Sequence, residues 1–187
     1  MKIIEFRMNT LPVLLGLGVA FLFATPAAAQ ESEHLKFATR LVEKAQLDKM
    51  AALGMRLSVR RAVAEGKATQ PFLECISAKE PDVFSHQIAS VYAEGLSVQE
   101  MKDALNFFES VVGRKYIAYT FHGTEKYAGF APSTPATTVT IGEKKLIEAF
   151  VLSAVGKQMS GTTSALAISS QREIAKLVEP ILASCRN

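Results

Sequence analysis

A helix-forming stretch near the middle of the chain occurs twice, and this repeat limits the folds open to the sequence. Residues 97–115 and 140–158 align at an offset of 43 positions and share the pattern [ST]-[VI]-x-E-x-K-x4-F-x2-S-x-V-G-[RK]. Each copy begins with S/T-x-x-E, a capping box that satisfies free N–H groups of a first helical turn. The repeat predicts two equivalent helices in an all-α fold. The matching pairs are Ser97 and Thr140, Glu100 and Glu143, Phe107 and Phe150, Ser110 and Ser153, and Gly113 and Gly156.

Two small residues in each copy predict a close helix contact. Ser110 and Gly113 lie three positions apart along a line with Phe107, and the second copy repeats this arrangement. Small side chains lower the profile of a helix, so a neighbouring helix can approach closely. We expect the two low-profile strips to face neighbouring helices, or each other across a pseudo-twofold relation. Each copy is expected to be one continuous helix, the second from Ile141 to about Met159.

The first copy also resembles a known family. The resemblance rests on Leu96-Ser97-x-x-Glu100 and on the run from Phe107 to Lys115. These residues are similar to the signature of the bacterial domain of unknown function 2059 family, approximately Leu-Ser-x-x-Glu and then Phe-Tyr-x-Ser-Pro-x-Gly-x-Lys. The resemblance implies a small, mostly helical protein exported to a Gram-negative periplasm, and it implies no activity or catalytic residue.

Two positions depart from the family pattern. Phe108 stands where the family has Tyr, and Val111 stands where it has Pro. Proline breaks or kinks a helix because it lacks an N–H and its ring clashes with the preceding turn. Because Val111 replaces that proline, the resemblance does not carry a bent central helix over to this chain.

The first 29 residues have the three parts of an export signal. Lys2 and Arg7 make a positive start, an apolar run follows from Leu11 to Phe23, and Ala27-Ala28-Ala29 forms a cleavage site. We expect residues 1–29 to be a cleaved signal peptide. The apolar run is shorter than the roughly 20 residues of a spanning helix, which favours cleavage. An uncleaved N-terminal anchor is the alternative. We expect a soluble exported protein, periplasmic by the resemblance, with no transmembrane segment in the mature chain.

Residues 30–187 are expected to form one helical domain. A chain of this length buries roughly 68–70% of its unfolded surface as a single domain. The formal net charge of the whole chain is +3, and removing Lys2, Glu5 and Arg7 with the signal leaves +2. A charge this small does not indicate a nucleic-acid partner.

The two cysteines, Cys75 and Cys185, predict one disulfide. Disulfides persist in the compartments to which a signal peptide leads, and two cysteines can form one intramolecular bridge. Closing a loop of 110 residues stabilises a fold by about 4–5 kcal/mol in the chain-entropy model. Two separate buried thiols are the alternative.

The apolar periodicity predicts a bundle of five or six helices. A stripe with spacings of three and four predicts a first helix from about Glu33 to Val63. Further stripes follow Pro71 and Pro81, and the last apolar stripe runs to Cys185. The longest irregular stretch is expected from Phe121 to Val139, where Gly, Pro, Ser and Thr are frequent.

Aromatic residues in and just before this stretch predict a ligand or partner surface. Long loops in compact domains are often functional, and aromatic side chains supply contact area. The alternative is that these side chains fasten the loop to the core. The candidates are Tyr116, Tyr119, Phe121, His122, Tyr127 and Phe130.

The sequence contains no recognisable catalytic or metal-binding pattern. His34, His86 and His122 are far apart and have no metal-ligand spacing, so no metal or cofactor is expected. Glu100 and Glu143 each have a capping role, which leaves general acid-base chemistry without a clear pair.

We therefore expect a non-enzymatic binding or protein-interaction module. The alternatives are a carrier of a small apolar ligand in a cavity between helices, and an enzyme whose site assembles from distant residues. A carrier needs an apolar cavity, an interaction module needs an exposed apolar patch, and an enzyme needs titratable groups converging in a cleft.

Overall fold

The computed structural model describes residues 26–160 and 165–186, and throughout these ranges the regular structure is helical. The all-α expectation is confirmed. The expected five or six helices are too few, because three of the long helices predicted from apolar stripes are each divided in two. The elements are α1 (Pro26–Ala45), α2 (Leu47–Ala64), α3 (Gln70–Ser77), the 3₁₀ helix η1 (Pro81–Phe84), α4 (Ser85–Gly95), α5 (Val98–Phe108), α6 (Val111–Tyr127), α7 (Ile141–Leu152), α8 (Ala154–Ser160) and α9 (Ala165–Cys185).

The first predicted helix is broken at Gln46. This residue has left-handed backbone angles, φ 54° and ψ 40°, and its side chain makes no capping hydrogen bond to α2. The break allows α1 to pack on α4 and α5, while α2 packs on α3 and η1. A hydrogen bond of 2.8 Å from Ser85 Oγ to Asp48 Oδ2 holds the start of α2 beside the start of α4.

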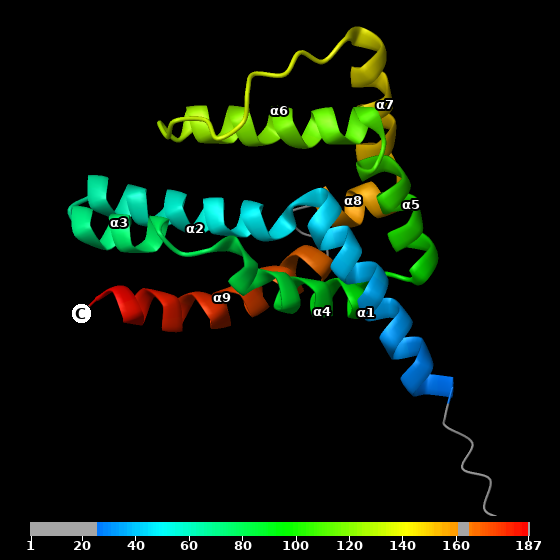
Figure 1. Cartoon of the computed structure of the whole chain (residues 1–187), viewed down its shortest axis with the longest axis horizontal. Helices are drawn as coiled ribbons and strands as arrows, with labels where there is room; N and C mark the ends of the chain where they lie inside the picture. Colours follow the sequence, from blue (N-terminus) through cyan, green and yellow to red (C-terminus); the bar gives the residue numbers. More distant parts are fainter. Residues whose placement is uncertain (1–25, 161–164, 187) are drawn as a thin grey trace, which may run out of the picture.

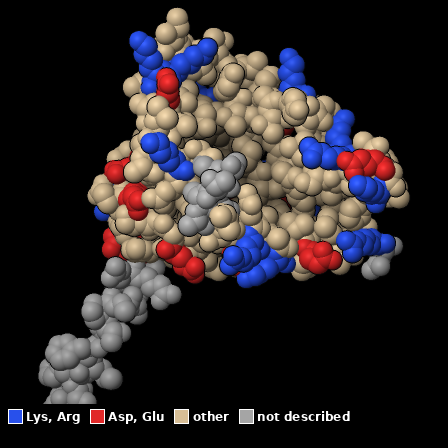
Figure 2. All heavy atoms as spheres, turned by 180° about the vertical axis from the view of Figure 1, so that it is seen from behind, with Lys and Arg blue, Asp and Glu red and all other residues tan. Residues whose placement is uncertain are grey.

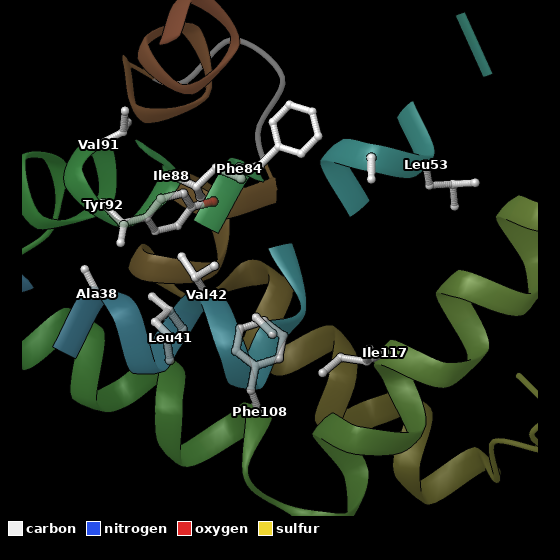
Figure 3. Packing of buried hydrophobic residues seen from close by; sticks show 14 of the residues in the cluster. Ala38, Leu41, Val42, Leu53, Phe84, Ile88, Val91, Tyr92, Phe108 and Ile117 are labelled. Atoms are coloured by element: carbon white, nitrogen blue, oxygen red, sulfur yellow. The ribbon is translucent and has the colours of Figure 1, made fainter. Parts of the chain in front are cut away.

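The core lies where α1 crosses α4 and α5. Figure 3 shows Leu41 and Val42 of α1 between Tyr92 of α4 on one side and Phe108 of α5 on the other. Leu41 and Phe84 are fully buried. The same cluster continues into η1, α2 and α3, where Phe84, Leu53 and Ile76 are fully buried, and its apolar burial stabilises the bundle as a whole. The body formed by α1, α2, α4 and α9 lies on one side of Figure 1, and α6 runs over it as a separate layer.

Helix α9 is fastened to α3 by the predicted disulfide. Cys75 and Cys185 are bridged, with their Cα atoms 5.7 Å apart. The prediction of a bridge is confirmed, and the alternative of two separate thiols is wrong. Along its length α9 also packs on α4 and α8, so the bridge closes the C-terminal end of the chain onto the bundle.

Each repeat copy is a helix–break–helix unit and not the continuous helix that was expected. In the first copy, α5 ends at Phe108 and Ser110 is the N-cap of α6. The Ser110 Oγ accepts a hydrogen bond from the N–H of Gly113 at 2.9 Å and donates one to the Phe107 carbonyl at 2.6 Å. Ser153 makes the same two bonds, at 3.0 and 2.6 Å, between α7 and α8. A hydroxyl that closes the first turn of a new helix is typical of an N-cap.

The glycines of the motif are needed at these breaks. A Cβ on Gly113 would overlap the carbonyl of Phe107, and a Cβ on Gly156 would overlap that of Phe150. The small residues therefore serve the bend within each copy, and the expected strip for a neighbouring helix stays a prediction. Val111 occupies the first position of α6, where a proline would also fit because that N–H has no helical partner.

The described residues contain no helix that is both long and apolar enough to cross a bilayer. Most of the expected signal peptide, residues 1–25, lies outside the described ranges. Helix α1 begins at Pro26, so cleavage after Ala29 would remove its first four residues.

Candidate functional site

The two repeat copies meet face to face through equivalent residues. The rings of Phe107 and Phe150 stack with centroids 3.9 Å apart and planes at 4°. Phe108 packs its edge against both of these rings. Stacked and edge-to-face aromatic pairs contribute about 0.5–1.5 kcal/mol each beyond the area they bury. The contact between the copies is therefore built on the aromatic residues of the shared motif.

Two polar contacts on either side of this stack join equivalent positions. Lys115 donates to Glu143 Oε1 at 2.6 Å, and Gln158 donates to Glu100 Oε1 at 2.8 Å. Residues 115 and 158 are 43 positions apart, as are residues 100 and 143. Each glutamate thus caps its own helix and also accepts a hydrogen bond from the other copy.

These contacts determine the charge state of the two glutamates. The hydrogen bond from Lys115, with the backbone and hydroxyl of Thr140, lowers the pKa of Glu143 to about 2. The hydroxyl and the backbone N–H of Ser97 lower the pKa of Glu100. A carboxylate held ionised by several donors is a poor proton donor or acceptor near neutral pH. Both glutamates therefore act as structural anions in this arrangement.

An apolar pocket lies beside the aromatic stack, between the start of α2 and the helices of both copies. Its volume is about 220 Å³. That is larger than the roughly 150 Å³ apolar cavity that binds benzene, and smaller than the roughly 300–1,000 Å³ pockets of drug-sized ligands. The wall is formed by Ala45, Leu47, Met50, Phe108, Tyr116, Ile117, Thr120, Phe121, Phe150, Val151, Gly156, Met159 and Ser160.

Two of the polar groups in this wall are occupied within the protein. The hydroxyl of Thr120 donates to the Tyr116 carbonyl at 2.8 Å, and that of Ser160 donates to the Gly156 carbonyl at 2.7 Å. The first bond lies within α6 and the second within α8. The pocket therefore offers a ligand mostly carbon and sulfur atoms, and its chemistry favours an apolar molecule. Figure 2 shows a hollow on one face of the molecule, bordered mainly by uncharged atoms.

A second, more polar cleft lies on the other side of α6. Its volume is about 580 Å³. Phe108, Ile117 and Phe121 line both spaces, so they separate the cleft from the apolar pocket. The cleft is also lined by charged residues of α1, α2 and α6, and its acidic groups are engaged nearby: Glu109 accepts two bonds of 2.8 Å from Arg40.

The six predicted aromatic-surface residues lie in three different surroundings. Tyr116 and Phe121 line the apolar pocket. Tyr119 and Tyr127 project from α6 and are 57% and 94% exposed. The remaining two, His122 and Phe130, are engaged with the segment that follows α6.

This segment is shorter than expected because α6 continues to Tyr127, so the irregular stretch covers residues 128–140. His122 Nδ1 lies 2.9 Å from the Thr134 carbonyl. The buried carboxylate of Glu125 accepts from the N–H of Ser133 at 2.8 Å. These bonds fasten the middle of the segment along α6.

The beginning of the segment is fastened to α2. Arg60 donates to the Gly129 carbonyl at 2.7 Å, and its guanidinium lies 4.7 Å from the centre of the Phe130 ring. Arg56 lies 5.6 Å from the same ring. Gly129 has a φ of 69°, which suits a residue without a Cβ. Phe130 therefore connects the segment after α6 to α2 across the gap between the two layers.

The described residues contain no group of three or more His, Cys, Asp or Glu side chains that could hold a metal ion. The three histidines stay apart. His34 Nδ1 lies 3.1 Å from the Ala93 carbonyl, and His122 is bound as described above.

The comparisons with known proteins support the predicted resemblance over one segment. Residues 82–120 match the model of a family described as an uncharacterized protein conserved in bacteria (DUF2059). This segment runs from η1 through α4 and α5 into α6, so it includes the first repeat copy and ends at Thr120 in the pocket wall. No curated protein and no solved structure shows a significant match to the chain.

Several pocket residues were not among the candidates taken from the sequence. Met50 and Val151 continue apolar stripes of the sequence and Met159 stands at the end of the second copy, so nothing in the sequence marks them as pocket residues. The repeat itself carried a signal that could have located the pocket. Phe107 and Phe150 are equivalent aromatic residues that stack between the two copies. Residues next to this pair therefore lie where the two copies meet, which is where the pocket is found.

Proposed function

We propose that this chain is an exported, periplasmic binding protein without enzymatic activity, and that its ligand is a small apolar molecule held in the apolar pocket. The single observation that carries the proposal is a pocket of about 220 Å³ whose wall is mainly apolar. Apolar pockets with few polar groups are typical of small-molecule sites. By volume, the ligand has the size of one or two fused rings or a short branched chain.

The arrangement of the repeat supports this reading. We propose that the two copies arose by internal duplication and pair about a pseudo-twofold axis through the Phe107–Phe150 stack. The cross contacts at positions 115 and 158, each to the glutamate of the other copy, support the pairing. A pocket beside such an axis can widen when the two copies move slightly apart, which would admit a ligand.

Export is supported by the N-terminal sequence and by the disulfide. The bridge between Cys75 and Cys185 suits a compartment in which thiols are oxidised. The absence of a catalytic role for Glu100 and Glu143 is supported by their capping bonds and lowered pKa values.

A protein partner is the second candidate, and the specific observation that favours it is the exposure of Tyr119 and Tyr127 on α6. These side chains are 57% and 94% exposed. Tyrosines are enriched at protein interfaces because they offer large contact area at low entropic cost. Replacing both by Ala should abolish capture of a partner if this candidate holds, and should leave binding in the pocket unchanged.

The pocket proposal is tested with N-phenyl-1-naphthylamine, a neutral dye whose fluorescence rises in apolar surroundings. Val151→Phe places a larger side chain in the pocket wall, whereas Ala149→Phe adds a ring to an exposed position of the same helix. We expect dye binding by the wild type and by Ala149→Phe, and at least tenfold weaker binding by Val151→Phe. Equal binding by all three folded proteins would place the dye elsewhere and contradict the proposal.

Native mass spectrometry of protein purified from its own compartment gives an independent test. A bound small molecule that is absent from Val151→Phe would support the carrier role. The denaturing mass of the same sample tests cleavage after Ala29, because the mature chain should begin at Gln30.

A further inference from the structure

Helix α7 is covered less than the other helices of the described chain. None of its residues is buried, and Ile141, Leu146 and Leu152 are 77%, 57% and 58% exposed. At about 100° per residue, these three side chains fall within one sector of roughly 140° on the helix. Lys145 is the one charged residue in this outer sector of α7. A short helix therefore presents an apolar face to solvent.

The equivalent helix of the first copy shows that this face is not required by the repeat. Subtracting 43 places Val98 at the position of Ile141, but the other positions of this sector carry polar side chains in the first copy, and most of them are exposed. These residues are Gln99, Lys102, Asp103 and Asn106 of α5, and Glu109 directly after it.

The inner side of the two helices differs in the opposite sense. Met101 and Leu105 of α5 are buried, and the matching residues of α7 are the exposed Lys144 and Glu148. The second copy thus carries exposed charged residues at two positions that are apolar and buried in the first. Because the pairing of the copies uses Phe150 and Glu143, the internal contacts do not account for Leu146 or Leu152.

The charges around α7 are mainly positive. Within the described residues, no ion pair engages Lys144, Lys145 or Lys157. Glu143 is occupied by Lys115, which leaves Glu148 as the unpaired acid on α7. In Figure 2, basic side chains with an acidic one among them stand beside uncharged surface at the upper left corner, where α7 lies.

We propose that the outer sector of α7 docks the protein on the surface of a bilayer that contains anionic lipids. Leucine and isoleucine side chains on one face of a helix enter the boundary between headgroups and acyl chains, while nearby lysines contact the headgroups. Helix α7 stands at the edge of the molecule (Figure 1) and is about 18 Å long. A stable protein complex buries about 800 Å² on each partner, which is a larger surface than one short exposed helix provides. The interface of a bilayer accommodates a single helix of this length.

The test is co-flotation of the full protein with vesicles of phosphatidylethanolamine and phosphatidylglycerol, compared with vesicles of phosphatidylcholine alone. The apolar variant is Leu146→Ser with Leu152→Ser, and the charge variant is Lys144→Glu with Lys145→Glu. The matched controls are Tyr127→Ser and Lys126→Glu at the far end of α6, which change exposed residues of the same kinds. Circular dichroism establishes that each variant has the wild-type helix content.

We expect the wild type and both controls to bind the anionic vesicles, and binding to the neutral vesicles to be much weaker. The apolar variant should bind at least tenfold more weakly, and the charge variant should lose anionic selectivity, because each lysine near such a surface contributes about a fivefold change in partitioning. Absence of wild-type binding, or equal binding by all variants, would overturn the proposal. Sedimentation velocity that shows a dimer lost in Leu146→Ser would also overturn it, since a second copy would then cover α7.

Discussion

Replacing Gly113 by alanine should destabilise the protein even though alanine is the better helix former. The added Cβ would overlap the Phe107 carbonyl, which accepts bonds from the Ser110 N–H at 3.0 Å and from the Ser110 hydroxyl at 2.6 Å. To relieve the overlap, this carbonyl must move and both bonds must lengthen. The same argument applies to Gly156 and the carbonyl of Phe150.

The size of the effect follows from these contacts. Two hydrogen bonds contribute about 1 kcal/mol each, and forcing extra volume into a packed site costs about 1–3 kcal/mol. The gain in helix propensity of about 0.5–1 kcal/mol offsets part of this loss. We expect Gly113→Ala to lower the free energy of unfolding by about 2–3 kcal/mol, which is a decrease of roughly 4–12 °C in Tm for a domain of this size.

The assay is urea unfolding followed by circular dichroism, with the disulfide intact. Gly123 on α6 and Gly142 on α7 are the matched controls, since a Cβ at either position meets no atom within 4 Å. Gly123→Ala and Gly142→Ala should be neutral or slightly stabilising. If Gly113→Ala were as stable as Gly123→Ala, the reasoning that the break requires a glycine would be refuted.

Three further predictions concern the disulfide, the cross-copy ion pair and the loop aromatics. Cys185→Ser should lower the free energy of unfolding by up to about 4–5 kcal/mol, measured by urea unfolding without reductant, and a loss below about 1 kcal/mol would contradict the bridge to Cys75. The pKa of Glu143 is about 2, below its ordinary value of 4.5, so its contribution to stability should be complete above about pH 5 and be lost as the pH falls towards 2. Lys115→Met should shift this loss to higher pH in a series of melting curves. An unchanged profile would show that Lys115 does not lower the pKa of Glu143. Tyr127→Ala should leave Tm unchanged, whereas Phe130→Ala should lower it because its ring lies against Arg60; equal Tm values would show that the loop is not fastened there.

Local hydrogen-bond chemistry was the part of the fold that the sequence predicted best. Both capping boxes form as the S/T-x-x-E pattern requires, with the N–H of Ser97 donating to Glu100 and that of Thr140 to Glu143 at 2.8 Å. The disulfide followed from the compartment that the N-terminal sequence predicts and from the number of cysteines. These predictions depend on neighbours in sequence or on a single choice of partner.

The helix breaks were missed because the apolar stripe continues through them. Ser110 and Ser153 could each stand within a helix. Only the hydrogen bond that each hydroxyl accepts from the N–H of the glycine three residues later shows that they are caps. Gln46 has no feature that predicts a left-handed conformation, since Gly and Asn are the residues that usually adopt it. Tertiary packing of α1 and α2 on different partners determines that break.

The site could be predicted only in part because burial depends on which face of α6 meets α2. Tyr116 and Tyr119 are three positions apart, and one lines the pocket while the other is exposed. The sequence showed the aromatic content of this region but not its division between two sides of a helix.

The most direct test of the proposed pocket uses the four methionines of residues 30–187. Met50 and Met159 line the pocket, whereas Met55 and Met101 are buried in the core. With ¹³C-labelled methionine methyl groups, NMR spectra are recorded while N-phenyl-1-naphthylamine is added. Binding in the pocket predicts that the Met50 and Met159 signals move together and saturate while those of Met55 and Met101 stay in place. Saturable binding that leaves Met50 and Met159 unmoved would contradict the account.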